Sequence, residues 1–229
     1  MRPQSYPVRV RGDLDPQLSR WQWLIKWILA VPHYVILIFL HLGVLVVTIV
    51  AFFAILITGK YPRPLFDFRL GVLRWRWRVS FYALSALGTD KYPPFSLRTK
   101  ADYPADLEVD YPERLNRGLV LIKWWLLAVP HYLILLVFFT AGWHVLTVNP
   151  NEFVAYLLPP LVEILLVIAM VGLLFTGRYP KGLFEFVLGI NRWAIRVVAY
   201  ATLMRDEYPP FRLDLGPRES MSVATPASS

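Results

Sequence analysis

The sequence predicts an all-α integral membrane protein built from two copies of one unit, with a small cytoplasmic β element beside the helices. Two observations lead to this prediction. The segments 21–58 and 119–176 are dominated by apolar residues, and each is longer than the run of about 18 apolar residues that suggests a membrane-spanning helix. The same short motifs flank both segments in the same order, which indicates an internal duplication.

Composition agrees with a membrane protein. Of the 229 residues, 56% are hydrophobic and 17% are charged, whereas soluble domains carry about 25% charged residues. The net charge is +8, and the basic residues lie beside tryptophan and phenylalanine next to the apolar segments. The expected partner is therefore the lipid bilayer with its anionic phospholipids, and not nucleic acid. The chain has no cysteine, which excludes disulfides, thiolate metal sites and a cysteine nucleophile.

The two copies are expected to cover residues 1–98 and 99–213, followed by a polar tail, 214–229, that is expected to be disordered. Each copy opens on Tyr-Pro and a short alternation of apolar and polar residues that predicts a strand. The strands around Val8, Phe95, Leu107 and Phe211 could pair into a cytoplasmic sheet that joins the halves. The motifs that recur are LIKW at 24–27 and 121–124, AVPHY at 30–34 and 128–132, TG(K/R)YP at 58–62 and 176–180, LF(D/E)F at 65–68 and 183–186, and YPPF at 92–95 and 208–211.

The distribution of basic residues predicts that each apolar segment is a transmembrane hairpin. Half of the 24 lysines and arginines lie in 60–123, and none lies in 28–59 or 125–177. Single crossings would put that middle segment opposite both termini, whereas two hairpins keep every basic residue on the cytoplasmic side. We therefore expect four spans with both termini cytoplasmic. The first hairpin (21–58) should turn near His41–Gly43, and the second (119–176) at Thr147–Glu152, between helices near 119–145 and 157–176.

Two further segments, 69–87 and 187–204, carry arginines four residues apart among aromatic residues. This spacing predicts amphipathic helices in the cytoplasmic membrane interface, with arginine at the level of the headgroup phosphates. A basic face that only orients the protein is the alternative. The candidate lipid-binding residues are Arg74, Trp75, Arg78, Arg192, Trp193 and Arg196.

The repeated AVPHY, TG(K/R)YP, LF(D/E)F and YPPF motifs resemble those of a bacterial membrane-protein family, domain of unknown function 4389. The resemblance covers nearly the whole chain, with one copy in each half. It implies a multi-pass protein of the bacterial cytoplasmic membrane and brings with it no activity, ligand or catalytic residue.

Three side chains are candidates for an intramembrane site. Glu163 lies about one turn inside the last predicted span, where a carboxylate suggests a proton or cation site unless it simply reaches the interface. His33 and His131 hold equivalent positions, and a parallel twofold arrangement would bring them together as haem ligands. Alternatively, each histidine satisfies carbonyl groups that the preceding proline leaves free, or lies at the membrane interface.

The sequence contains no motif of a nucleophilic, metal-dependent or phosphate-transferring enzyme, and no catalytic residue, metal ligand or cofactor is expected. We expect a non-catalytic accessory or scaffold subunit that packs against other membrane proteins through small residues. A small transporter or ion-coupled membrane protein and a bis-histidine haem electron carrier are the alternatives. The small residues proposed for partner contacts are Gly43, Ala51, Ala54, Ala169 and Gly172.

Overall fold

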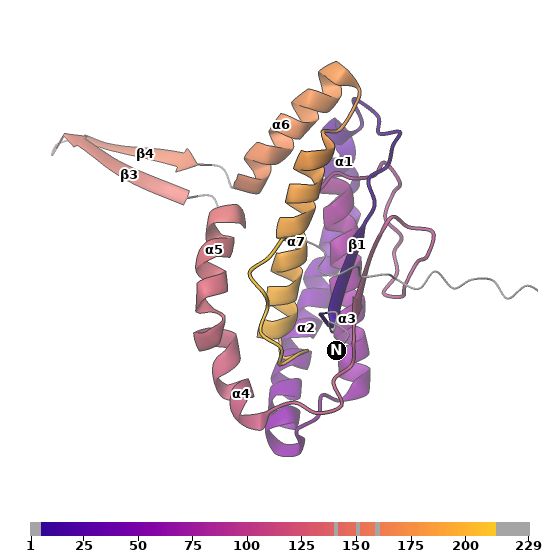
Figure 1. Cartoon of the computed structure of the whole chain (residues 1–229), viewed down its shortest axis with the longest axis vertical. Helices are drawn as coiled ribbons and strands as arrows, with labels where there is room; N and C mark the ends of the chain where they lie inside the picture. Colours follow the sequence, from indigo (N-terminus) through magenta and orange to yellow (C-terminus); the bar gives the residue numbers. More distant parts are fainter. Residues whose placement is uncertain (1–5, 140–141, 150–151, 159–160, 214–229) are drawn as a thin grey trace, which may run out of the picture.

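The computed structural model describes residues 6–139, 142–149, 152–158 and 161–213, so the predicted tail at 214–229 lies outside the described residues. The described chain is mostly helical, with two short antiparallel strand pairs (Figure 1). The helices are α1 (Trp23–Leu29), α2 (Val31–Thr58), α3 (Arg63–Ala83), α4 (Arg117–Ile122), the π-helical η1 (Lys123–Leu127), α5 (Val129–Phe139), α6 (Leu161–Thr176) and α7 (Lys181–Ala201). The strands are β1 (Val8–Gly12), β2 (Ala105–Val109), β3 (Gly142–Asn149) and β4 (Glu152–Leu158).

The first apolar segment forms the short helix α1 followed by one long helix, α2, and not a hairpin. Helix α2 runs without interruption for 28 residues and ends at Gly59, whose φ of 71° is the left-handed conformation typical of a helix-terminating glycine. The turn expected near His41–Gly43 is therefore wrong. A glycine inside a helix costs only about 1 kcal/mol, and a Cβ atom at Gly43 would lie 3.3 Å from the Phe68 ring. Gly43 thus allows α3 to approach closely and does not reverse the chain.

The second copy contains the same helix, interrupted by a β-hairpin. His131 and Thr176 are 45 residues apart, whereas His33 and Thr58 are 25 residues apart. The additional residues form the antiparallel pair of β3 and β4, and the chain reverses between Asn149 and Glu152 as predicted. The flanking helices extend less far than predicted, because residues 142–158 are rich in β-branched and aromatic side chains, which favour strands.

A smaller length difference explains η1. Between LIKW and AVPHY the second copy has one more residue than the first. A π-helical turn accommodates one extra residue inside a helix, and η1 lies at this position. Lys123 and His131 consequently keep the orientations that Lys26 and His33 have in the first copy.

The two copies run in opposite directions. The backbone amide of Leu115 donates to the carbonyl of Gly59 at 2.8 Å, so α4 begins where α2 ends. A Cβ atom on Gly177 would collide with the Arg20 guanidinium, so α6 ends where α1 begins. Figure 1 accordingly shows α4, α5 and α6 rising from one end of the molecule to the other. The parallel twofold arrangement expected from the sequence is wrong.

The predicted small sheet is confirmed for the strands around Val8 and Leu107, and it lies on the pseudo-twofold axis. The strands expected around Phe95 and Phe211 are not formed. Strands β1 and β2 pair antiparallel with Val10 opposite Leu107. Counted from the opening Tyr-Pro, these two residues hold the same place in their copies. The axis that relates the copies therefore passes between them. Helix α3 of the first copy packs on β2 of the second, and α7 of the second packs on β1 of the first.

Helices α3 and α7, expected at 69–87 and 187–204 as interfacial helices, are the inner helices of the fold. They begin earlier than expected, directly after Tyr-Pro, and pack between an outer apolar helix and the sheet. Phe66, Trp77, Phe184 and Trp193 are all buried. Apolar side chains surround these helices on most sides, which accounts for their place in the core.

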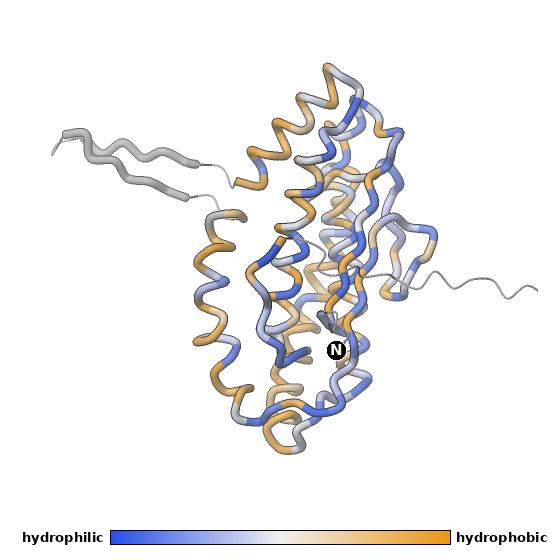
Figure 2. The backbone as a smooth tube through the Cα atoms, in the orientation of Figure 1, coloured by the Kyte–Doolittle hydropathy of each residue, from blue (hydrophilic) through white to orange (hydrophobic). Residues whose placement is uncertain are grey.

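Hydrophobic residues lie along one side of the molecule and hydrophilic residues along the other (Figure 2). Among the described residues, two helical stretches are long and apolar enough to cross a membrane, Val31–Thr58 and Arg117–Leu136, the second formed by α4, η1 and most of α5. Only 17% and 22% of their most apolar parts are buried. The opposite side carries the half-exposed ion pairs of Arg9 with Glu108 and Asp110 on the sheet. Arg74 in the middle of α3 donates to the Leu107 carbonyl, so this sheet lies at mid-length of the bundle.

Excision of the inserted hairpin tests the equivalence of α2 with α5 and α6. Replacing residues 140–160 by a single leucine, the counterpart of Leu42, should fuse α5 and α6 into one helix. We expect the free energy of unfolding to rise by up to about 3 kcal/mol, because the entropy cost of closing a loop of about 20 residues is no longer incurred. Circular dichroism should show an unchanged helical signal and an unfolding midpoint no lower than that of the wild type. Loss of cooperative unfolding would contradict the equivalence.

Candidate functional site

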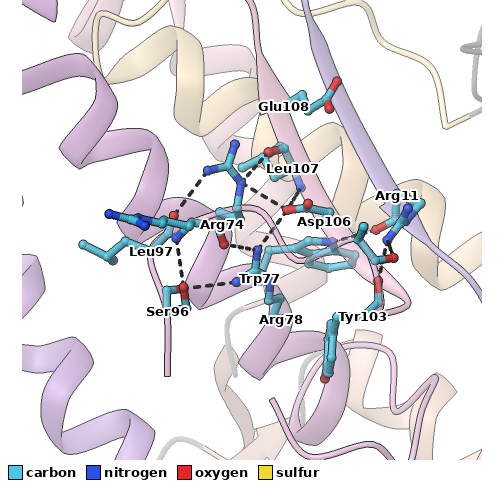
Figure 3. Close-up of polar contacts among 12 residues, drawn as sticks. Arg11, Arg74, Trp77, Arg78, Ser96, Leu97, Tyr103, Asp106, Leu107 and Glu108 are labelled. Carbon is cyan, nitrogen blue, oxygen red and sulfur yellow. Dashed lines mark hydrogen bonds and ion pairs between the residues drawn. The ribbon is translucent and has the colours of Figure 1, made fainter. Parts of the chain in front are cut away.

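Two arginines of α3, Arg74 and Arg78, bind Asp106 of the opposite copy (Figure 3). Arg78 is fully buried, and its guanidinium lies 3.2 Å from Asp106 Oδ1 and donates to the carbonyls of Ser96 and Arg98. Arg74 Nε lies 3.1 Å from the same carboxylate oxygen. Burial lowers the pKa of Arg78, and Asp106 opposes this shift. The guanidinium groups of Arg74 and Arg78 thus bind partners inside the protein and not the lipid headgroups that were expected as their ligands.

Arg192 and Arg196 have equivalent positions on α7. Arg192 Nε donates to the carbonyl of Val10 at 3.2 Å, as Arg74 does to that of Leu107. Arg196 is fully buried, and its guanidinium lies 5.5 Å from the centre of the Tyr6 ring. The four arginines that were predicted to bind headgroups therefore attach each inner helix to the strand segment of the other copy.

His33 lies in an aromatic box formed by three motifs of the first copy. Its ring stacks on Phe95 at a centroid distance of 3.9 Å and an angle of 13°. The Trp75 indole donates from Nε1 to His33 Nδ1 at 3.0 Å, and Tyr92 closes the box at 5.0 Å. The AVPHY motif, the tryptophan of α3 and the YPPF motif thus recur together because they build one structure.

His131 lies in the corresponding box of the second copy. Its ring stacks on Phe211 at 4.2 Å and meets Trp193 and Tyr208 at 5.5 and 4.8 Å. Both nitrogens of His131 and the Trp193 indole nitrogen have no hydrogen-bond partner among the described residues. His33 and His131 occupy separate boxes, because the copies run in opposite directions. The pairing near the axis that haem ligation requires is therefore not formed.

The lysine of the LIKW motif is a second internal anchor, which the sequence interpretation missed. Lys26 Nζ lies 2.7 Å from Asp90 Oδ1 and donates to the Thr89 carbonyl. Lys123 Nζ lies 2.6 Å from Asp206. Burial lowers the pKa of Lys26, and Asp90 opposes this shift. The signal was available, since an aspartate stands two residues before the tyrosine of YPPF in both copies.

Glu163 lies in the first turn of α6, exposed at the wall of a cavity of about 640 Å³ between α3, α5, α6 and α7. The lining is mainly apolar and includes Arg76, whose equivalent in the second copy is an alanine. A second cavity of about 500 Å³ between α2 and α3 shares Arg76, Ser80 and Leu84 with the first. Of the three predicted intramembrane candidates, only Glu163 lines either cavity.

The boxes, the lysine anchors and the left-handed Gly59 and Gly177 account for every repeated motif except LF(D/E)F. A comparison of the chain with known families finds the same repeat. The model of a family described as "Domain of unknown function (DUF4389)" matches residues 20–96 and 146–212. The chain belongs to this family. The two matches confirm the predicted resemblance and the presence of two copies. No curated protein and no solved structure matches the chain.

The first family match runs from Arg20 to Ser96 and thus includes α1, α2, α3 and the residues of the first aromatic box. The second includes α6, α7, Tyr208 and Phe211. In the described part of this family member, no group of three or more histidine, aspartate or glutamate side chains is placed to hold a metal ion.

Proposed function

We propose that this family member is a non-catalytic membrane protein that serves as an accessory or scaffold subunit of a membrane complex, embedded from the cytoplasmic side through its apolar face. One observation carries the proposal: hydrophobic residues gather along one side of the molecule and hydrophilic residues along the other, down the length of the helices (Figure 2). The exposed bulky residues of the apolar face include Phe39, Phe53 and Ile57 on α2 and Phe175 on α6.

The position of the sheet supports helices that lie parallel to the membrane. With α2 perpendicular to the bilayer, the ion pairs of Arg9 with Glu108 and Asp110 at mid-length would lie in the hydrocarbon core. Each charged residue at the bilayer centre costs at least about 2.5–3.5 kcal/mol. With α2 in the membrane plane, its apolar side meets the acyl chains and the sheet faces water. This orientation replaces the four expected spans and keeps the termini and basic residues on one side.

Labelling of introduced cysteines tests the orientation. Lys60 and Lys181 lie at opposite ends of the bundle, so perpendicular helices would place them on opposite sides of the membrane. In the cysteine-free chain, we expect K60C and K181C both to react with an impermeant maleimide in inside-out vesicles and neither to react in intact cells. F39C on the apolar face serves as an unreactive control. Reaction of K60C and K181C from opposite sides would contradict the proposal.

The opposite directions of the two copies favour a small transporter as the second candidate. Inverted repeats are typical of secondary transporters, in which the twofold axis lies in the membrane plane. In the proposed orientation the axis through Val10 and Leu107 follows the membrane normal instead. Labelling of K60C and K181C from opposite sides would therefore support the transporter.

The scaffold role requires a partner at the apolar face or the sheet. Gly43 and Gly172, expected as partner contacts, lie against Phe68 and Pro180 of the same chain, so a partner would meet larger side chains. Purification in a mild detergent should recover another membrane protein in a fixed ratio to this one. Recovery of this protein alone in repeated preparations would refute the scaffold role without affecting the orientation.

A further inference from the structure

The cavity between α3, α5, α6 and α7 has the size and the lining of a binding site for an amphiphile. Its volume of about 640 Å³ falls within the range of about 300–1,000 Å³ typical of ligand pockets. Apolar side chains such as Leu73, Trp77, Leu136 and Ile195 make up most of the wall. The adjoining cavity of about 500 Å³ begins at Arg76, so apolar space extends on both sides of this arginine.

Two opposite charges line the larger cavity, Arg76 on α3 and Glu163 on α6. Both residues are exposed, and neither has a hydrogen bond or ion pair within the described part of the chain. The contrast with Arg74 and Arg78 follows from helix geometry. Arg76 is two residues from each of them, about 200° around the helix, and thus points away from Asp106 and the sheet.

Neither charge is required by the repeated architecture. The position of Arg76 in the second copy is occupied by Ala194, and the position of Glu163 in the first copy by Leu45. The anchors Lys26, Arg74 and Arg78, by contrast, all have basic counterparts. Desolvation by its surroundings lowers the pKa of Arg76. A charge without a counter-charge is costly in an apolar environment, so in the embedding proposed above a ligand that supplies a counter-charge to each residue would be stabilised.

We propose that this cavity binds a zwitterionic phospholipid with a primary ammonium group, its phosphate on Arg76, its ammonium on Glu163 and an acyl chain along the apolar wall. Guanidinium binds phosphate through a bidentate pair of hydrogen bonds, and a carboxylate accepts from an ammonium N–H. An anionic phospholipid would satisfy Arg76 and be repelled by Glu163. A choline headgroup has no N–H to donate. The proposal rests on the membrane embedding proposed above.

The test measures which lipids the full chain retains. The protein is incorporated into nanodiscs that contain equal amounts of phosphatidylethanolamine, phosphatidylglycerol and phosphatidylcholine, extracted in mild detergent and analysed by quantitative mass spectrometry. We expect enrichment of phosphatidylethanolamine. R76Q and E163Q should each reduce this enrichment by about tenfold, since each removes a hydrogen bond to a charged group. R63Q is the matched control on the same helix, because Arg63 is exposed and pairs only with Asp67 among the described acidic residues.

The other outcomes would overturn the proposal. Equal retention of the three lipids would refute a specific site. Enrichment of phosphatidylglycerol that persists in E163Q would show an anionic ligand. Circular dichroism of each variant verifies that the helices are retained, so loss of lipid cannot be assigned to unfolding. Membrane fractionation distinguishes the two proposals. If the protein is found in the membrane fraction but shows no lipid preference, only this site is refuted and the membrane embedding stands.

Discussion

Replacing Asp106 by alanine should lower the free energy of unfolding by about 3–5 kcal/mol, the cost of leaving buried charges without their partner. The Asp106 carboxylate serves both Arg74 and Arg78, and only 5% of its side chain is exposed. Its loss leaves two guanidinium groups without the only carboxylate that the described residues provide for them. Denaturant unfolding in detergent, followed by tryptophan fluorescence, measures the change.

Glu108 supplies the matched control for this prediction. It lies two residues further along the same strand, pairs with Arg9, and has 43% of its side chain exposed. Exposed pairs contribute at most about 1 kcal/mol, so E108A should leave stability nearly unchanged. An equal effect of D106A and E108A would refute the role of Asp106 as the central anchor.

The two histidines should respond differently to the same substitution. H33F removes the acceptor of the Trp75 indole and leaves a buried donor unsatisfied, which costs about 1–3 kcal/mol. H131F removes two buried nitrogens that have no partner among the described residues, so its effect should be neutral or stabilising. Phenylalanine preserves the stacking on Phe95 and Phe211 in both variants.

Thermal unfolding of both variants, with the wild type alongside, checks this difference. The near-ultraviolet absorption of the buried indoles should also change in H33F and remain constant in H131F. Equal destabilisation of the two variants would mean that ring packing alone, and not the hydrogen bond from Trp75, makes His33 important.

The sequence predicted the duplication, the paired strands and the helical character, because these depend on local order and on motifs that recur. It failed on the course of α2, where Gly43 was interpreted as a turn. Only the approach of Phe68, 25 positions later in the sequence, explains that glycine. The absence of basic residues from 28–59 and 125–177 was interpreted as evidence for two transmembrane hairpins. Helices that lie flat in the membrane, as proposed above, satisfy the same distribution without any crossing.

The candidate site was less predictable than the fold. The repeated Arg-x-x-x-Arg pattern indicated a charged helix face, but its partner, Asp106, lies on a strand of the other copy. In the first copy the corresponding residue is Arg9, so comparison of the copies concealed this pair. Arg76 could not be identified from the sequence, because it fits the alternation of arginine and tryptophan around it. The cavity that it shares with Glu163 is formed only in the fold, where the inserted hairpin separates α5 from α6.

The crossed packing of inner helix and strand has a consequence for ancestry. A chain with a single copy would leave its strand unpaired and its inner helix uncovered, so it would have to form a homodimer with antiparallel chains. In that dimer the residue at the position of Val10 and Leu107 would face its own symmetry mate. Such symmetry forbids Asp106 in one strand and Arg9 in the other. Fusion of two genes removes this restriction, and each half of the former dimer interface can then evolve its own charges.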